Sequence, residues 1–127
     1  MITEEQVNII AEECALDNWD DEGSVAVKAA SLERARLFIK MYGELLPPTG
    51  AHFYCSSAGE VTVEWATQSE VKENNALLVI YFGGTEIEYF HILGYMPQDI
   101  MFSCETRSIE NAFKVLSVFL GAIHKGN

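Results

Sequence analysis

Apolar residues recur every three or four positions in the first third of the chain, which is the period of an amphipathic helix. Thr3 and Gln6 have the spacing of a capping box, and they begin a predicted helix over about residues 4–16. Ser31 caps a second predicted helix, which a pair of prolines ends. The two helices should form a hairpin. Their apolar stripes are Val7, Ile10, Ala11 and Cys14, and then Leu32, Ala35, Phe38, Ile39, Tyr42, Leu45 and Leu46.

Beyond residue 50 the apolar positions follow a period of two, which indicates β-strands. Residues 60–65 alternate strictly between polar and apolar side chains, and this pattern predicts a strand with one buried face. Residues 51–55 precede that strand across a run of turn formers at 56–59. These segments are therefore predicted to pair as a first hairpin.

A second hairpin is predicted around Gly83 and Gly84, because two adjacent glycines suit the positive φ angles of a two-residue turn. Residues 76–82 and 85–93 flank this turn as strands. The first of them is an uninterrupted apolar run, whereas a strand with one face in water should alternate. Both faces of this hairpin should therefore be covered.

Pairing across that turn sets Leu78 opposite Tyr89 and Ile80 opposite Ile87 on one face. The other face then carries apolar residues edged by two carboxylates: Leu77, Val79, Tyr81 and Phe90, with Glu86 and Glu88. We predict that a second copy of the chain covers this face, so that the protein is a homodimer through the second hairpin. The alternative is that the predicted helices divide between the two faces of the sheet.

Residues 100–104 can add an edge strand, and Ser108 then caps a last helix. The wide apolar stripe of that helix should lie on the sheet: Ile109, Ala112, Phe113, Leu116, Phe119, Leu120 and Ile123. The predicted fold over residues 1–127 is a single α+β domain with a helical hairpin, an antiparallel sheet of four or five strands and a C-terminal helix packed on the sheet. Strands and crossover helices do not alternate, which excludes a parallel, doubly wound sheet.

Composition and charge narrow the classes of partner. The 127 residues are 49% hydrophobic and 21% charged, which is typical of a globular domain. Nineteen acidic and eight basic side chains give a formal net charge of -11, which repels nucleic acid and anionic membrane surfaces. We therefore expect no nucleic acid and no membrane as partner, but a basic protein or a cationic small molecule. An acidic surface also serves solubility alone.

The cysteines and the N-terminus predict a cytoplasmic location. Cys14, Cys55 and Cys104 are odd in number and widely spaced, which is unsuited to a disulfide framework and indicates a reducing compartment. Glu4 and Glu5 stand where a secretory signal carries lysines, and no apolar run approaches transmembrane length.

Two tryptophan motifs carry a resemblance to a known group of proteins. Residues 16–23 are Leu-Asp-Asn-Trp-Asp-Asp-Glu-Gly, residues 45–47 are Leu-Leu-Pro, and residues 59–65 are Gly-Glu-Val-Thr-Val-Glu-Trp. This order resembles a family of uncharacterised small bacterial proteins with an Asn-Trp-Asp-Gly motif and a later Gly-x-hydrophobic-x-hydrophobic-Glu-Trp strand. Asp21 stands where that family usually has glycine. The resemblance implies genes near mobile elements or toxin–antitoxin loci, and the chain is also similar in style to integron gene cassette proteins. Neither resemblance implies a catalytic residue.

The acidic segment can be laid on a calcium-binding loop, but it lacks the decisive ligand. The first, third, fifth and sixth positions of an EF-hand loop would be Asn18, Asp20, Glu22 and Gly23. The twelfth position, which requires a bidentate carboxylate, is Ala29. We therefore predict a structural loop in which Asp17 or Asp20 shapes the turn while Trp19 inserts into the core.

A zinc site is considered and rejected on spacing. His52 and Cys55 form an H-x-x-C pair, which His91 and Cys104 could complete. Structural zinc sites usually show paired, closely spaced ligands, whereas these residues are scattered singly through apolar strands. No metal and no cofactor is predicted.

Two further arrangements could carry catalysis. Cys55 could act as a nucleophile with His52 or His91 as its base, and Glu86 with Glu88 could form a carboxylate pair. The carboxylates lie in a predicted amphipathic surface strip rather than in a closed cleft. No catalytic residue is predicted.

The sequence thus favours a non-enzymatic binding or interaction module for a basic partner. The alternative is a small enzyme or ligand binder with a pocket between sheet and helices, lined by Tyr54, Trp65, Tyr89 and His91. Such aromatic residues are more often plain core, and Trp19 with Trp65 are predicted to be buried anchors.

Overall fold

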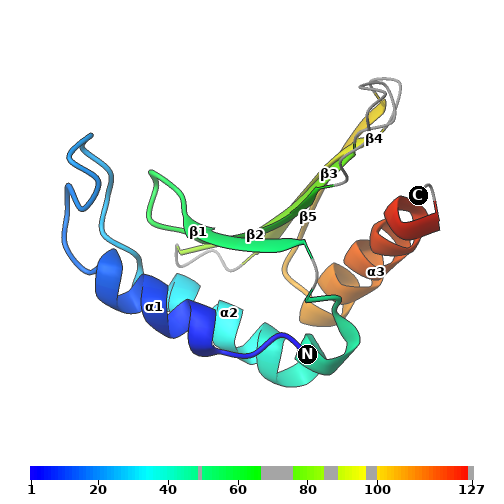
Figure 1. Ribbon diagram of the computed structural model, residues 1–127, viewed down its shortest axis with the longest axis horizontal. Helices are drawn as coiled ribbons and strands as arrows, with labels where there is room; N and C mark the ends of the chain where they lie inside the picture. The colour runs from blue at the N-terminus through cyan, green and yellow to red at the C-terminus, as the bar shows by residue number, and fades with distance from the viewer. Residues whose placement is uncertain (49, 67–75, 85–88, 97–99, 126–127) are drawn as a thin grey trace.

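The computed structural model describes residues 1–48, 50–66, 76–84, 89–96 and 100–125. Within them, helices lie on one side of an antiparallel sheet, so the predicted α+β class is confirmed (Figure 1). In chain order the elements are α1 (Glu5–Glu13), α2 (Ala29–Tyr42), the 3-10 turn η1 (Gly43–Leu45), β1 (Ala51–Cys55), β2 (Val61–Ala66), β3 (Leu77–Phe82), β4 (Phe90–Met96), β5 (Ile100–Thr106) and α3 (Ile109–Lys125). None of the described helices is both long and apolar enough to span a lipid bilayer.

The sheet is a meander, in which each strand pairs with the next one along the chain in the order β1-β2-β3-β4-β5. The first hairpin is confirmed, since Phe53 in β1 lies opposite Val63 in β2. Gly59 closes its turn with φ +81°, and a Cβ at this position would lie 2.4 Å from the carbonyl oxygen of Ala26. Only glycine fits there, because both the backbone angle and the space exclude a side chain.

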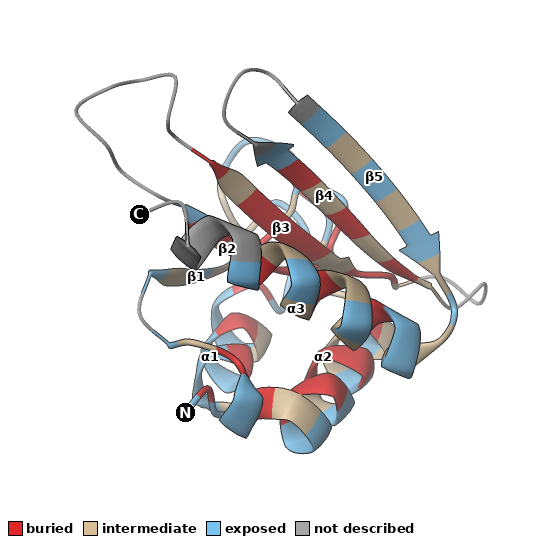
Figure 2. Cartoon of the chain, turned by 90° about the vertical axis from the view of Figure 1, so that its right-hand side faces the viewer, coloured by how far each residue is buried: buried red, intermediate tan, exposed pale blue. Residues whose placement is uncertain are grey.

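All described helices pack against the same face of the sheet (Figures 1 and 2). Helix α1 lies beside β1, α2 lies against β2 and β3, and α3 crosses β3, β4 and β5. The core fills the space between the two layers, and its largest fully buried side chains include Phe38, Phe82, Leu78, Ile80, Ile92 and Leu116. The alternative, that the helices divide between the two faces, is wrong. The apolar stripes of all three helices are buried against one face of the sheet.

Helix α2 begins earlier than the sequence predicts, and Ser31 does not cap it. Lys28 occupies the N-cap position without a side-chain hydrogen bond. Ser31 lies inside the helix, fully buried, where its hydroxyl donates to the carbonyl oxygen of Phe82 at 2.7 Å and accepts from the N–H of Val61 at 2.8 Å. The serine therefore joins the helix to two strands. A capping residue also uses its hydroxyl to bind backbone groups, but it stands at the end of the helix rather than inside it.

The predicted capping box at Thr3 does not form either. Glu4 is the N-cap of α1, and the Thr3 hydroxyl accepts a long hydrogen bond from the N–H of Glu5 at 3.4 Å. Helix α1 ends at Glu13 rather than near residue 16, with Cys14 as its C-cap. In α3 the predicted cap is confirmed, because the Ser108 hydroxyl accepts from the N–H of Asn111 at 3.2 Å.

The second hairpin is present, but its predicted two-residue turn and its register are wrong. Strand β4 begins at Phe90, and Leu78 lies opposite Gly94 rather than Tyr89. Neither Gly83 nor Gly84 has a positive φ. Both glycines are required by close packing instead. A Cβ on Gly83 would lie 2.8 Å from the carbonyl oxygen of Tyr89, and a Cβ on Gly84 would lie 2.6 Å from the Lys28 side chain.

This register moves the partner of Leu78 from residue 89 to residue 94, a shift of five positions, which is odd and so exchanges the two faces of β4. Phe90 therefore turns toward the helices, with its ring 6.1 Å from that of Phe38. His91 turns to the opposite face, across from Tyr81. The predicted placement of Phe90 on the second face is thus wrong.

The edge strand β5 is confirmed, and α3 covers its inner side. The Phe102 and Phe119 rings stack at 3.4 Å between centroids. A Cβ on Gly94 would lie 1.8 Å from the Phe102 ring, so the glycine in β4 provides the space that this ring occupies.

Candidate functional site

The sheet face opposite the helices collects the polar and aromatic residues of the strands, and we call it the open face. Strand register places on it His52, Tyr54, Thr62, Glu64, Ala66, Leu77, Val79, Tyr81, His91, Leu93, Tyr95, Met101, Ser103 and Glu105. These described positions include tyrosines, histidines and two carboxylates but no lysine or arginine. No described helix covers this face (Figure 1).

Two tyrosines shelter the middle of the open face. Tyr54, Thr62 and Tyr81 lie side by side on β1, β2 and β3. Thr62 is 0% exposed and Val79 is 3% exposed, although no described helix lies above them. Burial raises the pKa of the Tyr54 hydroxyl well above its usual range, and the nearby Tyr81 and Glu64 raise it further. Tyr54 therefore stays protonated.

His91 lies between a hydroxyl and a carboxylate on the neighbouring strand. It pairs directly opposite Glu105, and Ser103 lies two residues earlier on β5, so that both side chains project to the same face. The His91 Nε2 atom is 2.9 Å from the Ser103 hydroxyl oxygen, and Nδ1 is 3.9 Å from a Glu105 carboxylate oxygen. The Tyr81 ring lies 5.8 Å from the imidazole on the other side.

The open face has a polar part and an apolar part. His52 stacks on Tyr54 with ring centroids 5.5 Å apart, which extends the polar part to the edge strand β1. The apolar part includes Leu77 and Leu93, with Tyr95 47% exposed and Met101 62% exposed. Leu77, Val79 and Tyr81 share this face as predicted, whereas Glu86 and Glu88 lie outside the described residues.

The pocket predicted between sheet and helices does not form from its four residues. Tyr54 and His91 lie on the open face, whereas Trp65 lies on the helix side, 3% exposed, where its Nε1 donates to the carbonyl oxygen of Pro47 at 2.9 Å. Tyr89 precedes β4. Tyr54 pairs with Thr62, which lies three positions before Trp65. Strand alternation therefore places Tyr54 and Trp65 on opposite faces of the sheet.

The residues considered for zinc are likewise divided between the faces. His52 and His91 lie on the open face, whereas Cys55 and Cys104 lie on the helix side. Among the residues that the structure describes, no three His, Cys, Asp or Glu side chains are grouped to hold a metal ion.

Cys55 does not serve as a nucleophile at neutral pH. Its side chain is 7% exposed, and burial raises the pKa of its thiol to about 12, with the neighbouring Cys14 contributing. The two histidines considered as its base, His52 and His91, both lie on the other face of the sheet. The cysteine–histidine arrangement considered from the sequence therefore does not form.

The carboxylates of Asp17 and Asp20 shape the acidic segment, as predicted. The Asp20 carboxylate accepts from the N–H groups of Glu22 and Ser24 and from the Ser24 hydroxyl, and these bonds, the hydroxyl first, lower the pKa of Asp20. Asp17 accepts from the N–H of Ala26 at 2.9 Å. Trp19 does not insert fully into the core: it is half-buried, with Nε1 donating to the carbonyl oxygen of Val25 at 3.0 Å.

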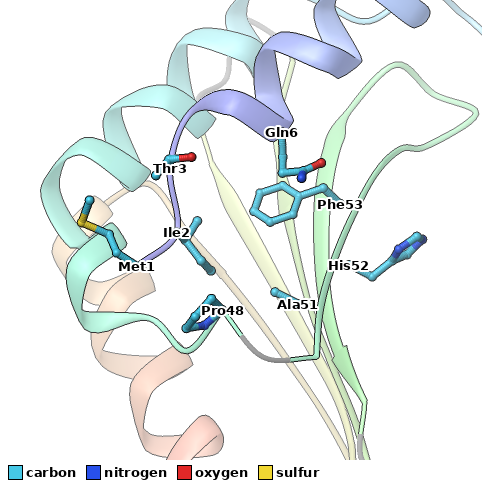
Figure 3. Close-up of a pocket in the computed structure, with 8 residues that line it drawn as sticks. All are labelled: Met1, Ile2, Thr3, Gln6, Pro48, Ala51, His52 and Phe53. Carbon is cyan, nitrogen blue, oxygen red and sulfur yellow. The ribbon is translucent and has the colours of Figure 1, made fainter.

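A separate cavity of about 440 Å³ lies between the N-terminal segment and β1 (Figure 3). Its lining is Met1, Ile2, Thr3, Gln6, Pro48, Ala51, His52 and Phe53. In Figure 3 the His52 ring points away from the Ile2 and Gln6 side chains. The polar side-chain groups that face the cavity are then the Thr3 hydroxyl and the Gln6 amide, which offer little chemistry for a specific ligand.

No protein-family model, curated protein or solved structure matches the chain. The geometry therefore identifies the open face as the candidate site. Sequence reasoning missed its members Glu64, Ser103 and Glu105. The alternation of Met101, Ser103 and Glu105 with less polar neighbours in β5 is the signal that could have found two of them, once β4 was paired in its true register.

Proposed function

We propose that the protein is a binding module whose open face binds a basic segment of another protein. The observation that supports this most is the combination of aromatic rings and carboxylates on a helix-free face without a described lysine or arginine. Guanidinium and ammonium groups are attracted both to carboxylates and to the faces of aromatic rings. The open face supplies both kinds of group within neighbouring strands.

Charge favours the same partner at long range. The net charge of -11 attracts a basic chain from a distance and speeds its association. At contact, Glu64 on β2 lies near Tyr54 on the edge strand β1, Glu105 lies on the opposite edge strand β5, and Tyr81 lies between the two carboxylates on β3. A segment with several arginine side chains could therefore meet a carboxylate and a ring at each of two places.

The form of the face favours a protein segment over a small cation. Small molecules are usually held in concave pockets that bury most of their surface, whereas this face spreads over the strands of a sheet. Tyr95 and Met101 at the apolar end offer contact to the nonpolar side chains of a larger partner. A basic protein segment can use both ends at once.

Charge also weighs against the homodimer that the sequence suggests. Two copies that meet through this face would each carry a net charge of -11 and would place the Glu64 and Glu105 carboxylates of both copies in one interface. Like charges placed together oppose association. A basic partner covers the apolar end without that repulsion, so it is the occupant we propose.

We also propose a reducing, cytoplasmic setting. The three cysteines are free, and Cys14 and Cys55 are buried. Such unpaired thiols are typical of proteins in reducing compartments.

The test is a titration with a fluorescent arginine-rich peptide, read by anisotropy. We expect binding that weakens steeply with salt, and about tenfold weaker binding for the double variant Glu64→Gln, Glu105→Gln. The matched control is Glu12→Gln, Glu33→Gln, which changes the net charge equally at exposed helix positions and should bind nearly as wild type.

Two outcomes would contradict the proposal. Equal weakening in both double variants would show that net charge alone attracts the peptide. Light scattering that gives a dimer which Met101→Lys converts to a monomer, together with no peptide binding, would assign the open face to self-association instead.

A further inference from the structure

We propose that Ser103 is a nucleophile, with His91 as its general base, in the hydrolysis of activated carboxylic esters. The His91 Nε2 atom and the Ser103 hydroxyl oxygen are 2.9 Å apart, which is the distance expected between a catalytic hydroxyl and its base. Glu105 lies on the far side of the same ring, with 3.9 Å between its carboxylate and Nδ1. A nucleophile, a base and an acidic group that orients the base thus lie next to one another in space.

Strand geometry holds the three groups together. His91 and Glu105 are directly opposed on β4 and β5, and Ser103 is the diagonal neighbour on the same face. The Tyr81 ring, 5.8 Å away on β3, borders the imidazole from the other side and limits its rotation. Sites built on strands keep their geometry better than sites on loops.

The positions of the two ring nitrogens assign their roles. A proton on Nδ1 faces the Glu105 carboxylate, which stabilises that tautomer, and Nε2 is then left to accept the Ser103 proton. The side chain of His91 is 25% exposed and that of Glu105 is 65% exposed, so an ester can approach from solvent. Glu105 acts through His91 and is a positioning residue.

The reaction proceeds in two balanced steps. The Ser103 oxygen attacks the ester carbonyl carbon while Nε2 of His91 accepts the hydroxyl proton; the carbon–oxygen bond to the leaving group breaks, and that alcohol departs with the proton. Water then attacks the acyl-serine ester, giving a proton to Nε2, and the carboxylic acid leaves as the Ser103 oxygen regains the proton. One water is consumed, and no electrons change hands.

The surroundings define the class of substrate. Strand β4 pairs with β3 on one side and β5 on the other, so its backbone N–H groups are committed to the sheet rather than to an oxyanion. With no oxyanion donor supplied by β4, we expect a good leaving group to be required. Activated esters such as aryl acetates meet that requirement.

This inference shares Glu105 with the proposed binding function but can be tested apart from it. Binding depends on the charge and the rings of the open face, whereas hydrolysis also requires the Ser103 oxygen. A Ser103→Ala protein should bind the arginine-rich peptide as wild type does while losing the hydrolytic activity. The two ideas can therefore fail separately.

The experiment uses p-nitrophenyl acetate with the full chain carrying Cys104→Ala, so that this half-buried thiol in β5 does not react. We expect Ser103→Ala and His91→Gln each to lower kcat/KM by about a hundredfold, the scale of a lost acid–base pair. Ser57→Ala, at an exposed serine in the β1–β2 turn, should leave the rate unchanged. Acid quenching followed by mass spectrometry should locate one acetyl group on Ser103.

Glu105→Gln should lower kcat with little change in KM, and Glu105→Asp should recover part of the loss. Circular dichroism should show that each variant is folded, because Ser103 and Glu105 are exposed. A Ser103→Ala protein that keeps the wild-type rate would overturn the inference. Acetyl groups found on histidine or lysine but not on Ser103 would overturn it as well.

Discussion

Ser31 in α2 and Phe82 in β3 are joined by a buried hydrogen bond, 2.7 Å from the serine hydroxyl to the phenylalanine carbonyl oxygen. The same hydroxyl accepts from the N–H of Val61 in β2 at 2.8 Å. One side chain thus fixes the helix against two adjacent strands. This attachment holds α2 on the core side and leaves the opposite side of the sheet to the open face.

Replacing Ser31 by alanine should lower the free energy of unfolding by about 1–3 kcal/mol, because a buried N–H and a carbonyl lose their partner. Denaturant unfolding measures the change. Ser117→Ala is the control, since that hydroxyl donates an exposed hydrogen bond to the carbonyl oxygen of Lys114 within α3, and its effect should stay within about 0.5 kcal/mol. Equal effects for the two variants would contradict the role of Ser31.

The two tryptophans should differ in their contribution to stability. Trp65 is 3% exposed and donates a hydrogen bond to the carbonyl oxygen of Pro47, so Trp65→Ala should lower the free energy of unfolding by about 3–5 kcal/mol. Trp19 is half-buried, and Trp19→Ala should cost about 1–2 kcal/mol because less surface leaves the core. The denaturant midpoints report both values, and a larger loss at Trp19 would be the opposite of the expected order.

The Cys55 thiol should make the protein less stable in alkaline solution. Its pKa rises from 9.0 to about 12 on folding, chiefly through burial. Above pH 9 the unfolded chain releases a proton that the folded protein keeps, so the free energy of unfolding falls from there toward pH 12 and is unaffected at neutral pH. Denaturant unfolding at rising pH should show a shallower decline for Cys55→Ala than for wild type. Parallel declines would exclude this thiol as a cause.

The acidic loop should not need a metal ion. Asp20 and Asn18 already accept hydrogen bonds from the N–H groups of Glu22, Ser24 and Gly23, which occupy the oxygens that a cation would require. Neither added calcium nor a strong chelator should shift the melting temperature, whereas Asp20→Ala should lower it. A fall in Tm on chelation would show that a metal stabilises the fold.

The helices and strands could be predicted from local sequence patterns, but the set of residues on the open face could not. Periods of 3.6 and two predict helices and strands because they depend on near neighbours alone. Register depends on the connection, and here Gly83 and Gly84 suggested a tight turn although they serve the close approach of Tyr89 and Lys28. That single misinterpretation exchanged the faces of β4.

The same error hid the His91 site. With Leu78 set opposite Tyr89, the pairing of His91 with Tyr81 and Glu105 could not be found. Ser31 was misplaced for a related reason, since a polar residue at the start of an apolar stripe suggests a cap unless a strand carbonyl is known to lie above it. Contacts between distant segments decide both features.

Amide chemical-shift mapping of the labelled protein with an arginine-rich peptide tests the proposed binding face most directly. We predict that the signals of Tyr54, Tyr81, His91 and Glu105 move together and saturate at one affinity, while those of exposed α2 positions such as Leu37 stay in place. Shifts confined to the helices, or spread evenly over all acidic positions, would contradict the assignment of the open face as the binding surface.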